Sequence, residues 1–232
     1  EFIQDAATSV DRTAQRLQTQ AGLQLDYDAL IVSVGNIPCD KGSTGALEHA
    51  SDTKSVDACN RLGNRLTRLA AMPGERPVVI VGAGIEGLEM LGEILRRFGG
   101  KEQLDLHLIE SKDSLFERFP GMHEHLVQRM GQQVMLHCGQ HVEKVAADHV
   151  LLADGTIIPS RITLWTAGSH GHPLLSSTGL SQKNQEAPVN EGLQSLFDPT
   201  IFIIGDAARL PHPLEKQAYH AQDMGRHVAH SV

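Results

Sequence analysis

Hydrophobic residues in this chain form continuous runs and runs spaced by three or four positions. The continuous runs predict buried strands at 29–35, 77–81, 104–109, 134–137 and 200–204, the first of them buried on both faces. The spaced runs predict amphipathic helices at 55–71, 88–99, 123–131 and from 214 onward. In the first of these helices the buried face is expected to consist of Val56, Cys59, Leu62, Leu66 and Leu69.

Shorter strand-like stretches occupy the rest of the chain. Residues 1–11 and 16–19 predict two strands near the start. A β-meander is predicted from the stretches 142–146, 150–152, 156–158 and 162–166, with Asp154 and Gly155 as a hairpin turn. Residues 40–54, rich in glycine, serine and threonine, are expected to form a connector. Strands alternating with helices from 77 to 137 indicate a βαβαβ unit in an α/β protein.

Composition narrows the classes of function. Acidic residues outnumber basic ones by 28 to 20, and the formal net charge of −8 argues against nucleic acid as a partner. No apolar stretch approaches the roughly 18 residues of a membrane span, and no signal peptide opens the chain. The three cysteines lie far apart without a CxxC pair, which predicts reduced thiols in a cytoplasmic protein.

A glycine-rich motif follows the strand at 77–81, with the sequence Gly82-Ala83-Gly84-Ile85-Glu86-Gly87. In a dinucleotide-binding loop, the first glycine permits a tight turn, the second lets a pyrophosphate approach the backbone, and the third lets helix and strand pack. The following helix N-terminus offers N–H groups to the phosphates. The alternative is a glycine-rich turn without a ligand.

Glu110 closes the next strand, about twenty residues after the loop. A carboxylate there accepts hydrogen bonds from the adenosine ribose hydroxyls and repels a 2′-phosphate. The sequence therefore predicts binding of NADH in preference to NADPH. The alternative for Glu110 is an ordinary acid at a strand end, and nearby Lys112 is a cation that would help to hold a 2′-phosphate.

Thirteen histidines raise the question of a metal site. On the last predicted helix, one stripe carries polar side chains and another face carries apolar ones predicted to pack inward. The stripe consists of His220, Asp223, His227 and His230, and the inward face of Ala221, Met224 and Val228. A solvated polar face explains the stripe, because the sequence shows no buried partners for such ligands. No metal ligand is predicted.

Four motifs resemble the pyridine nucleotide-disulfide reductase superfamily of flavoproteins, and within it most closely the type II NADH dehydrogenases. YDALIVSVG at 27–35 is similar to the family's YDxLvxAtG, and IVGAGIEGLEMLGEI at 80–94 to its IVGxGxxGxExAGEL. LWTAG at 164–168 is similar to viWxAG, and TIFIIGDAA at 200–208 to xvFaiGDxA. The resemblance implies a three-layer Rossmann-like NAD(P)-binding domain, with a parallel sheet and a β-meander, and remnants of a FAD-binding domain of the same type. The expected boundaries are a FAD-domain remnant at 1–40, the NAD(P)H-binding domain with a helical lead-in at 41–170 and a second FAD-domain remnant at 171–232.

The resemblance also implies an activity, in which hydride passes from NADH to FAD and electrons pass on to a small-molecule acceptor such as a quinone. The cofactors carry this chemistry, so no catalytic side chain is predicted. Beyond the loop and Glu110, the implied cofactor contacts are Glu89 near the nicotinamide, Gly168, Gly35, Gly205 and Asp206, the last at the FAD ribityl chain. The alternatives are a non-catalytic NADH-binding redox sensor and a disulfide or ferredoxin-type reductase of the same superfamily.

The sequence of the last predicted helix does not identify the electron acceptor. The quinone-site helix of the family carries AQxAxQ, whereas residues 218–223 have Tyr219 and Asp223 in place of the two glutamines. The acceptor therefore remains a quinone, a disulfide or a protein.

Two features of the family have no counterpart in the printed sequence. One is a first GxGxxG before Tyr27, which binds the FAD pyrophosphate, and the other is a C-terminal domain that forms the dimer interface or faces the membrane. We therefore expect an internal fragment of a cytoplasmic protein, peripheral to the inner membrane face only through the missing C-terminal region. The chain alone is expected to bind no FAD and to show no turnover. It is also expected to self-associate through its flavin-domain remnant, where Ile31, Ile201 and Ile203 lack packing partners.

Overall fold

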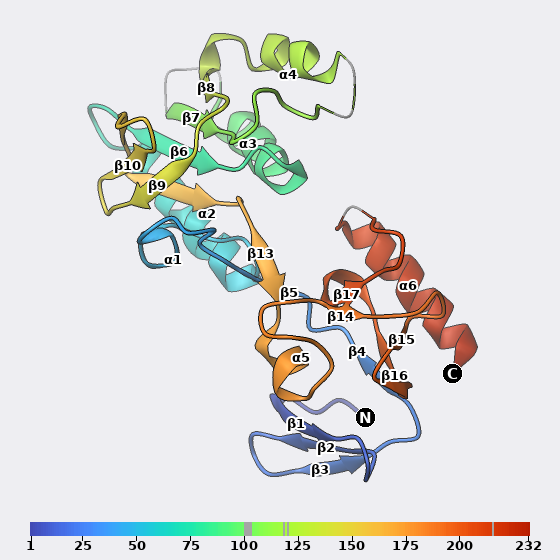
Figure 1. Cartoon of the computed structure of the whole chain (residues 1–232). Coiled ribbons are helices and arrows are strands. Elements are labelled where there is room, and N and C mark those ends of the chain that lie inside the picture. Colours follow the sequence, from blue (N-terminus) through green and yellow to red (C-terminus); the bar gives the residue numbers. More distant parts are fainter. Residues whose placement is uncertain (100–103, 118, 120, 215) are drawn as a thin grey trace. The chain divides into compact units, whose positions relative to one another are not determined.

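The chain forms two compact units in a computed structural model that describes residues 1–99, 104–117, 119, 121–214 and 216–232. One unit combines residues 1–37 with 170–232, and the other consists of residues 38–169 (Figure 1). The chain crosses between the units within β5 (Asn36–Pro38) and β13 (Ser169–Gly171), two strands that pair with each other. The boundaries predicted at residues 40 and 170, and the cofactor assigned to each part, stay predictions.

A parallel sheet of four strands, in the order β12-β6-β7-β8, forms the centre of the unit 38–169. Its strands are β6 (Pro77–Val81), β7 (Asp105–Ile109), β8 (Val134–His137) and β12 (Ile162–Trp165). Every residue of β6 is buried, as a strand covered on both faces requires. The expectation that β12 continues the meander is wrong, because β12 pairs in parallel with β6 and all four of its residues are buried.

Three helices cover one face of this sheet: α2 (Val56–Ala70), α3 (Ile85–Phe98) and α4 (Met122–Met130). The Ser55 side chain caps α2 by accepting a hydrogen bond from the Ala58 N–H. The buried stripe of α2 is Ala58, Leu62, Leu66 and Leu69. Val56 and Cys59 are exposed, so their predicted place in the core is wrong. The first turn of α2 therefore buries Ala58 and leaves Val56 and Cys59 in solvent.

An antiparallel sheet of β9 (Val142–Val145), β10 (His149–Leu152) and β11 (Ile157–Pro159) supplies the third layer. Its buried residues share a hydrophobic cluster with Val79, Val81 and Trp165 of the parallel sheet. The predicted turn at Asp154 and Gly155 is confirmed: Gly155 has φ 88° and the Thr156 N–H donates to Asp154 Oδ1 over 2.9 Å. Within the predicted connector lies a short helix, α1 (Ala46–His49). The three-layer arrangement with its meander is thus confirmed.

The other unit contains smaller sheets. Its strands are β1 (Ala7–Asp11), β2 (Arg16–Thr19), β3 (Gln24–Asp26), β4 (Leu30–Val32), β14 (Ala187–Pro188), β15 (Gln194–Ser195), β16 (Asp198–Ile203) and β17 (Ala208–Arg209). Strands β1, β2 and β3 form one sheet, β15, β16 and β4 a second, and β14 and β17 a third. The helices are α5 (Pro173–Ser177) and α6 (Ala218–Ser231). The structure also describes two single 3-10 turns. One is η1 (Gly131–Gln133), in the unit of residues 38–169, and the other is η2 (Gly205–Ala207), in the unit of residues 1–37 and 170–232.

Several expectations for this unit are corrected by the packing. Ile201 and Ile203 are fully buried in a cluster with Leu175 of α5 and Val228 of α6, so the expectation that they lack packing partners is wrong. The strand expected at 29–35 is shorter, and Ile31 is 44% exposed, so β4 is buried on one face only.

The last helix begins at Ala218, four residues later than predicted, after a segment containing two prolines. Its inward face holds as predicted, with Val228 buried and Met224 packed against the same cluster. Of the helices that the structure describes, none has the length and apolar character to cross a membrane.

Candidate functional site

The glycine-rich loop connects the carboxyl end of β6 to the N-terminus of α3. Gly82 has φ +98°, and a Cβ added to it would lie 2.8 Å from the Ala167 backbone. A Cβ at Gly87 would overlap the Gly82 carbonyl oxygen. The fold itself therefore requires glycine at both positions, for a left-handed turn and for close contact between strand and helix.

Gly84 lies between them under different constraints. It is the exposed N-cap of α3, its φ is −68°, and no atom lies within 4 Å of the position that a Cβ would occupy. The space in front of this residue is therefore open. The unpaired N–H groups and partial positive charge of a helix N-terminus suit an anion at this place.

Glu110 follows β7 and is half-buried beside the loop. Its Oε2 accepts a hydrogen bond from the Ala83 N–H over 2.9 Å. Its Oε1 accepts from Ser111 Oγ over 3.2 Å and from the Lys112 N–H over 3.1 Å. The carboxylate is thus held at the carboxyl ends of β6 and β7, within hydrogen-bonding distance of the glycine-rich loop.

Thr166, directly after β12, is a contact that the motifs did not reveal, because its position is variable in the family pattern. Its hydroxyl donates to the carbonyl oxygens of Val81 and Gly82, at 2.9 and 2.8 Å. Gly168 lies two residues further on, and a Cβ there would overlap the side chain of Lys41. The end of β12 therefore supports the first turn of the loop.

Glu86, in the first turn of α3, is held by residues that precede α2. Its carboxylate accepts hydrogen bonds from Thr53 Oγ1 and from Lys54 Nζ, the second over 2.7 Å. Nothing in the sequence indicated this contact, because Thr53 and Lys54 lie 33 and 32 residues before Glu86. Glu89 is exposed in the second turn of the same helix.

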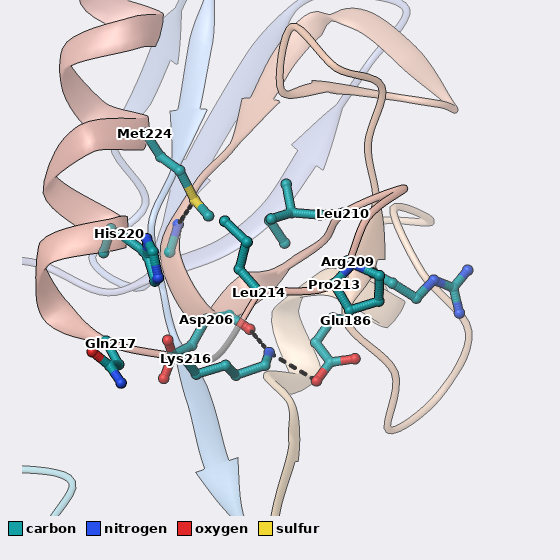
Figure 2. Close-up of a pocket in the computed structure, with 13 residues that line it drawn as sticks. Glu186, Asp206, Arg209, Leu210, Pro213, Leu214, Lys216, Gln217, His220 and Met224 are labelled. Atoms are coloured by element: carbon teal, nitrogen blue, oxygen red, sulfur yellow. Dashed lines mark hydrogen bonds and ion pairs between the residues drawn. The ribbon is translucent and has the colours of Figure 1, made fainter. Parts of the chain in front are cut away.

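The remaining predicted cofactor residues lie in the unit of residues 1–37 and 170–232. Gly35 follows β4 and Gly205 follows β16, and these two strands are parallel neighbours. Both glycines have positive φ, +67° and +64°. Asp206 lines a cavity of about 240 Å³ with Leu210, Lys216, His220 and Met224 (Figure 2). Gly35 and Asp206 are thus placed at the same ends of adjacent strands.

Lys216 is one of the residues that line this cavity. Its Nζ donates to the Asp206 carbonyl oxygen over 2.6 Å and to Glu186 Oε1 over 2.9 Å, as Figure 2 shows. Burial acts to raise the pKa of Glu186, but the hydrogen bond and charge of Lys216 outweigh it and hold that pKa below its usual value. Glu186 is therefore ionised and paired at neutral pH.

Two residues of the polar stripe on α6 make local contacts with Arg226. Asp223 pairs with Arg226 over 2.8 Å, and His230 Nδ1 lies 2.7 Å from the Arg226 carbonyl oxygen. Across the part of the chain that the structure describes, no three His, Cys, Asp or Glu side chains gather as metal ligands would.

The fold is a Rossmann-type α/β arrangement with a glycine-rich loop at the carboxyl end of its parallel sheet. The sequence matches the pyridine nucleotide-disulphide oxidoreductase family over residues 1–225, and the chain belongs to this family. It is 24% identical to a type II NADH:quinone oxidoreductase of Staphylococcus haemolyticus, covering 100% of this chain and 64% of the relative. It is 25% identical to an NADH dehydrogenase-like protein of Bacillus subtilis, covering 93% and 59%. The chain thus spans less than two thirds of the length of these curated relatives.

Solved structures show the same fold. A ferredoxin reductase from Rhodopseudomonas palustris superposes with a TM-score of 0.84 at 22% identity, covering 100% of this chain and 58% of that one. The sulfide:quinone oxidoreductase of Aquifex aeolicus gives 0.82 at 22% identity, covering 100% and 60%. NDH2 of Plasmodium falciparum, solved in complex with NADH, gives 0.75 at 17% identity, covering 91% and 51%. The predicted fold class is confirmed by these superpositions.

Proposed function

We propose that this chain is the NADH-binding part of a FAD-dependent oxidoreductase in which hydride passes from NADH to FAD. The observation that carries the proposal is the Glu110 carboxylate, fixed 2.9 Å from the Ala83 N–H at the N-terminal side of α3. In α/β sheets, dinucleotides bind outside the carboxyl ends of the strands, where the acid meets the ribose and the helix meets the pyrophosphate. The curated relatives named for NADH support the same assignment.

Each residue of the loop region has a separate part in binding. The open space at Gly84 admits the pyrophosphate to the N-terminus of α3. Glu110 accepts hydrogen bonds from the ribose hydroxyls and repels a 2′-phosphate. Glu89, exposed in the second turn of α3, is proposed to lie near the nicotinamide. The nucleotide itself supplies the hydride when bound, and the chain supplies its placement.

We extend the proposal to the flavin through the other unit. Gly35, Gly205 and Asp206 are proposed to contact one end of FAD in the whole protein. The cavity beside Asp206 measures about 240 Å³, below the roughly 300–1,000 Å³ of sites that enclose a whole small-molecule ligand. It therefore fits a part of a flavin nucleotide.

The electron acceptor is proposed to be a quinone, as the names of the curated relatives suggest. Tyr219 and Asp223 are exposed on α6 where the family's quinone helix carries glutamine, and this difference favours a disulfide or protein acceptor as the alternative. In the whole protein we expect NADH-dependent reduction of a short-chain quinone. Reduction of a ferredoxin with no quinone activity would establish the alternative.

A titration of the chain with NADH and with NADPH tests the nucleotide site. We expect NADH to bind more tightly by about 1–3 kcal/mol, the scale of a hydrogen bond to a charged group. Glu110→Arg should narrow or invert this preference, and Glu110→Gln should narrow it. Glu75→Arg makes the same charge change near the opposite end of β6 and should preserve the preference. Equal affinity of the unmodified chain for both nucleotides would contradict the assignment.

A further inference from the structure

The carboxylate of Glu86 lies where it would repel the phosphates of NADH at the proposed site. The inference drawn from this residue rests on the proposed function. It lies two residues after Gly84, in the first turn of α3. An acidic side chain in a first turn interacts favourably with the helix dipole. A pyrophosphate at the same helix end competes for that partial positive charge and is repelled by an unpaired carboxylate. The chain also carries a net charge of −8, which adds to the repulsion of an anionic ligand.

Both oxygens of the Glu86 carboxylate are engaged by the segment that precedes α2. Oε1 accepts from Thr53 Oγ1, and Oε2 accepts from Lys54 Nζ over 2.7 Å. The Lys54 and Glu86 side chains are 30% and 35% exposed, so the pair is partly shielded from solvent. The Lys54 N–H also donates to Asp52 Oδ1 over 2.8 Å, which orders the backbone that carries the lysine.

We propose that Lys54 is a positioning residue for the dinucleotide: it pairs with the Glu86 carboxylate and thereby removes a repulsive charge from the pyrophosphate position. Thr53 contributes by holding the second carboxylate oxygen. The segment between α1 and α2 is thus part of the nucleotide site, although it carries no motif for one. The affinity of the loop for a phosphate-bearing ligand depends on this pair.

A double-mutant cycle of Lys54→Met and Glu86→Gln tests the proposal in the chain as printed, by titration with NADH at low ionic strength. Lys54→Met should weaken NADH binding roughly three- to tenfold, the size of one unpaired charge acting on two phosphates through solvent. In the Glu86→Gln background the same substitution should cause no such loss. Lys54→Arg should retain the parent affinity, and Thr53→Val should weaken binding less than Lys54→Met does.

Control measurements distinguish an electrostatic effect of Lys54 on binding from a purely structural effect of its ion pair with Glu86. Lys144→Met removes an equal charge at an exposed position of β9 and should leave NADH affinity unchanged. The loss in Lys54→Met should shrink as salt is added. It should also be absent for adenosine, which has no phosphate, and present for ADP-ribose, which has two.

The outcomes that overturn the proposal are distinct. Unchanged NADH affinity in Lys54→Met, or an equal loss for adenosine, would overturn it while the NADH site stands. The same loss in the Glu86→Gln background would assign Lys54 a contact of its own and overturn the pairing role. Absence of NADH binding in the parent chain would overturn the proposed function and this inference together.

Discussion

At the scale of single residues, the three glycines of the loop are present for two different reasons. Gly82 and Gly87 are required by the chain itself, since a Cβ at either position would collide with backbone atoms. Gly84 meets no such constraint, because its φ is ordinary and the space around it is open. For this glycine we propose the close approach of a ligand to the helix N-terminus as the reason.

Gly84→Val is therefore expected to leave the chain folded and to weaken NADH binding strongly, because the branched side chain fills the space that the pyrophosphate needs. Titration with NADH and thermal unfolding measure the two effects. Gly92→Val is the matched control, since Gly92 lies in the same helix and also has open space around it. If Gly84→Val binds NADH as tightly as the parent, the pyrophosphate lies elsewhere.

At the scale of elements, the contact between β6 and α3 depends on the absence of one side chain. A Cβ at Gly87 would overlap the Gly82 carbonyl oxygen and would lie 2.8 Å from Thr166 Oγ1. The first of these is a backbone atom at the end of a fully buried strand, so it has little freedom to move. Strand, loop and helix are consequently locked to one another at this point.

Gly87→Ala is expected to lower the free energy of unfolding by about 1–3 kcal/mol, the usual cost of overpacking a dense interior. Gly92→Ala should instead raise it by up to about 1 kcal/mol, because alanine is the better helix former and its Cβ meets open space. Denaturant unfolding of both variants measures the difference. A Gly87→Ala variant as stable as Gly92→Ala would contradict the close contact.

At the scale of the whole molecule, stability depends on pH through a pair of histidines on neighbouring strands. His107 Nδ1 lies 3.1 Å from His137 Nε2, and the rings are stacked with centroids 5.4 Å apart. Burial lowers the pKa of both histidines, and for His107 the charge of His137 lowers it further while Asp105 acts to raise it. The folded chain therefore favours the neutral form of both rings.

Because both pKa values lie below 6.5 in the folded chain, the unfolded chain binds more protons just below that pH. The free energy of unfolding should therefore fall as the pH drops through 6.5, and the decline should end below the folded-state pKa values. His107→Phe keeps a stacked ring and should flatten this part of the profile, whereas His125→Phe changes an exposed histidine and should not. Parallel profiles for His107→Phe and the parent would contradict the assignment to this pair.

Whether the chain binds FAD also depends on the whole molecule. The printed sequence contains one GxGxxG, at 82–87, and the cavity beside Asp206 measures about 240 Å³, below the roughly 300–1,000 Å³ of sites that enclose a whole small-molecule ligand. We expect the purified 232-residue chain to bind NADH, to be colourless and to show no NADH dehydrogenase turnover. An absorbance spectrum after addition and removal of excess FAD measures this, and a stoichiometric flavin band would refute it.

Local patterns in the sequence were sufficient for much of this protein. The buried strand at 77–81, the loop from Gly82 to Gly87 and the acid at Glu110 follow from continuous apolar residues and glycine spacing, which depend on neighbours along the chain. The hairpin at Asp154 and Gly155 follows from turn chemistry for the same reason. The family resemblance rests on the order of such local motifs.

Only the tertiary structure decided how distant segments meet. It placed β12 beside β6, buried Ile201 and Ile203, and exposed Val56 and Cys59. It also brought Lys54 to Glu86 and Thr166 to the Gly82 carbonyl. The contact between Lys54 and Glu86 joins residues 32 positions apart, and the one between Thr166 and Gly82 joins residues 84 positions apart. The physical reason is that burial and charge pairing depend on which elements pack together, and periodicity within one element carries no information about its partner.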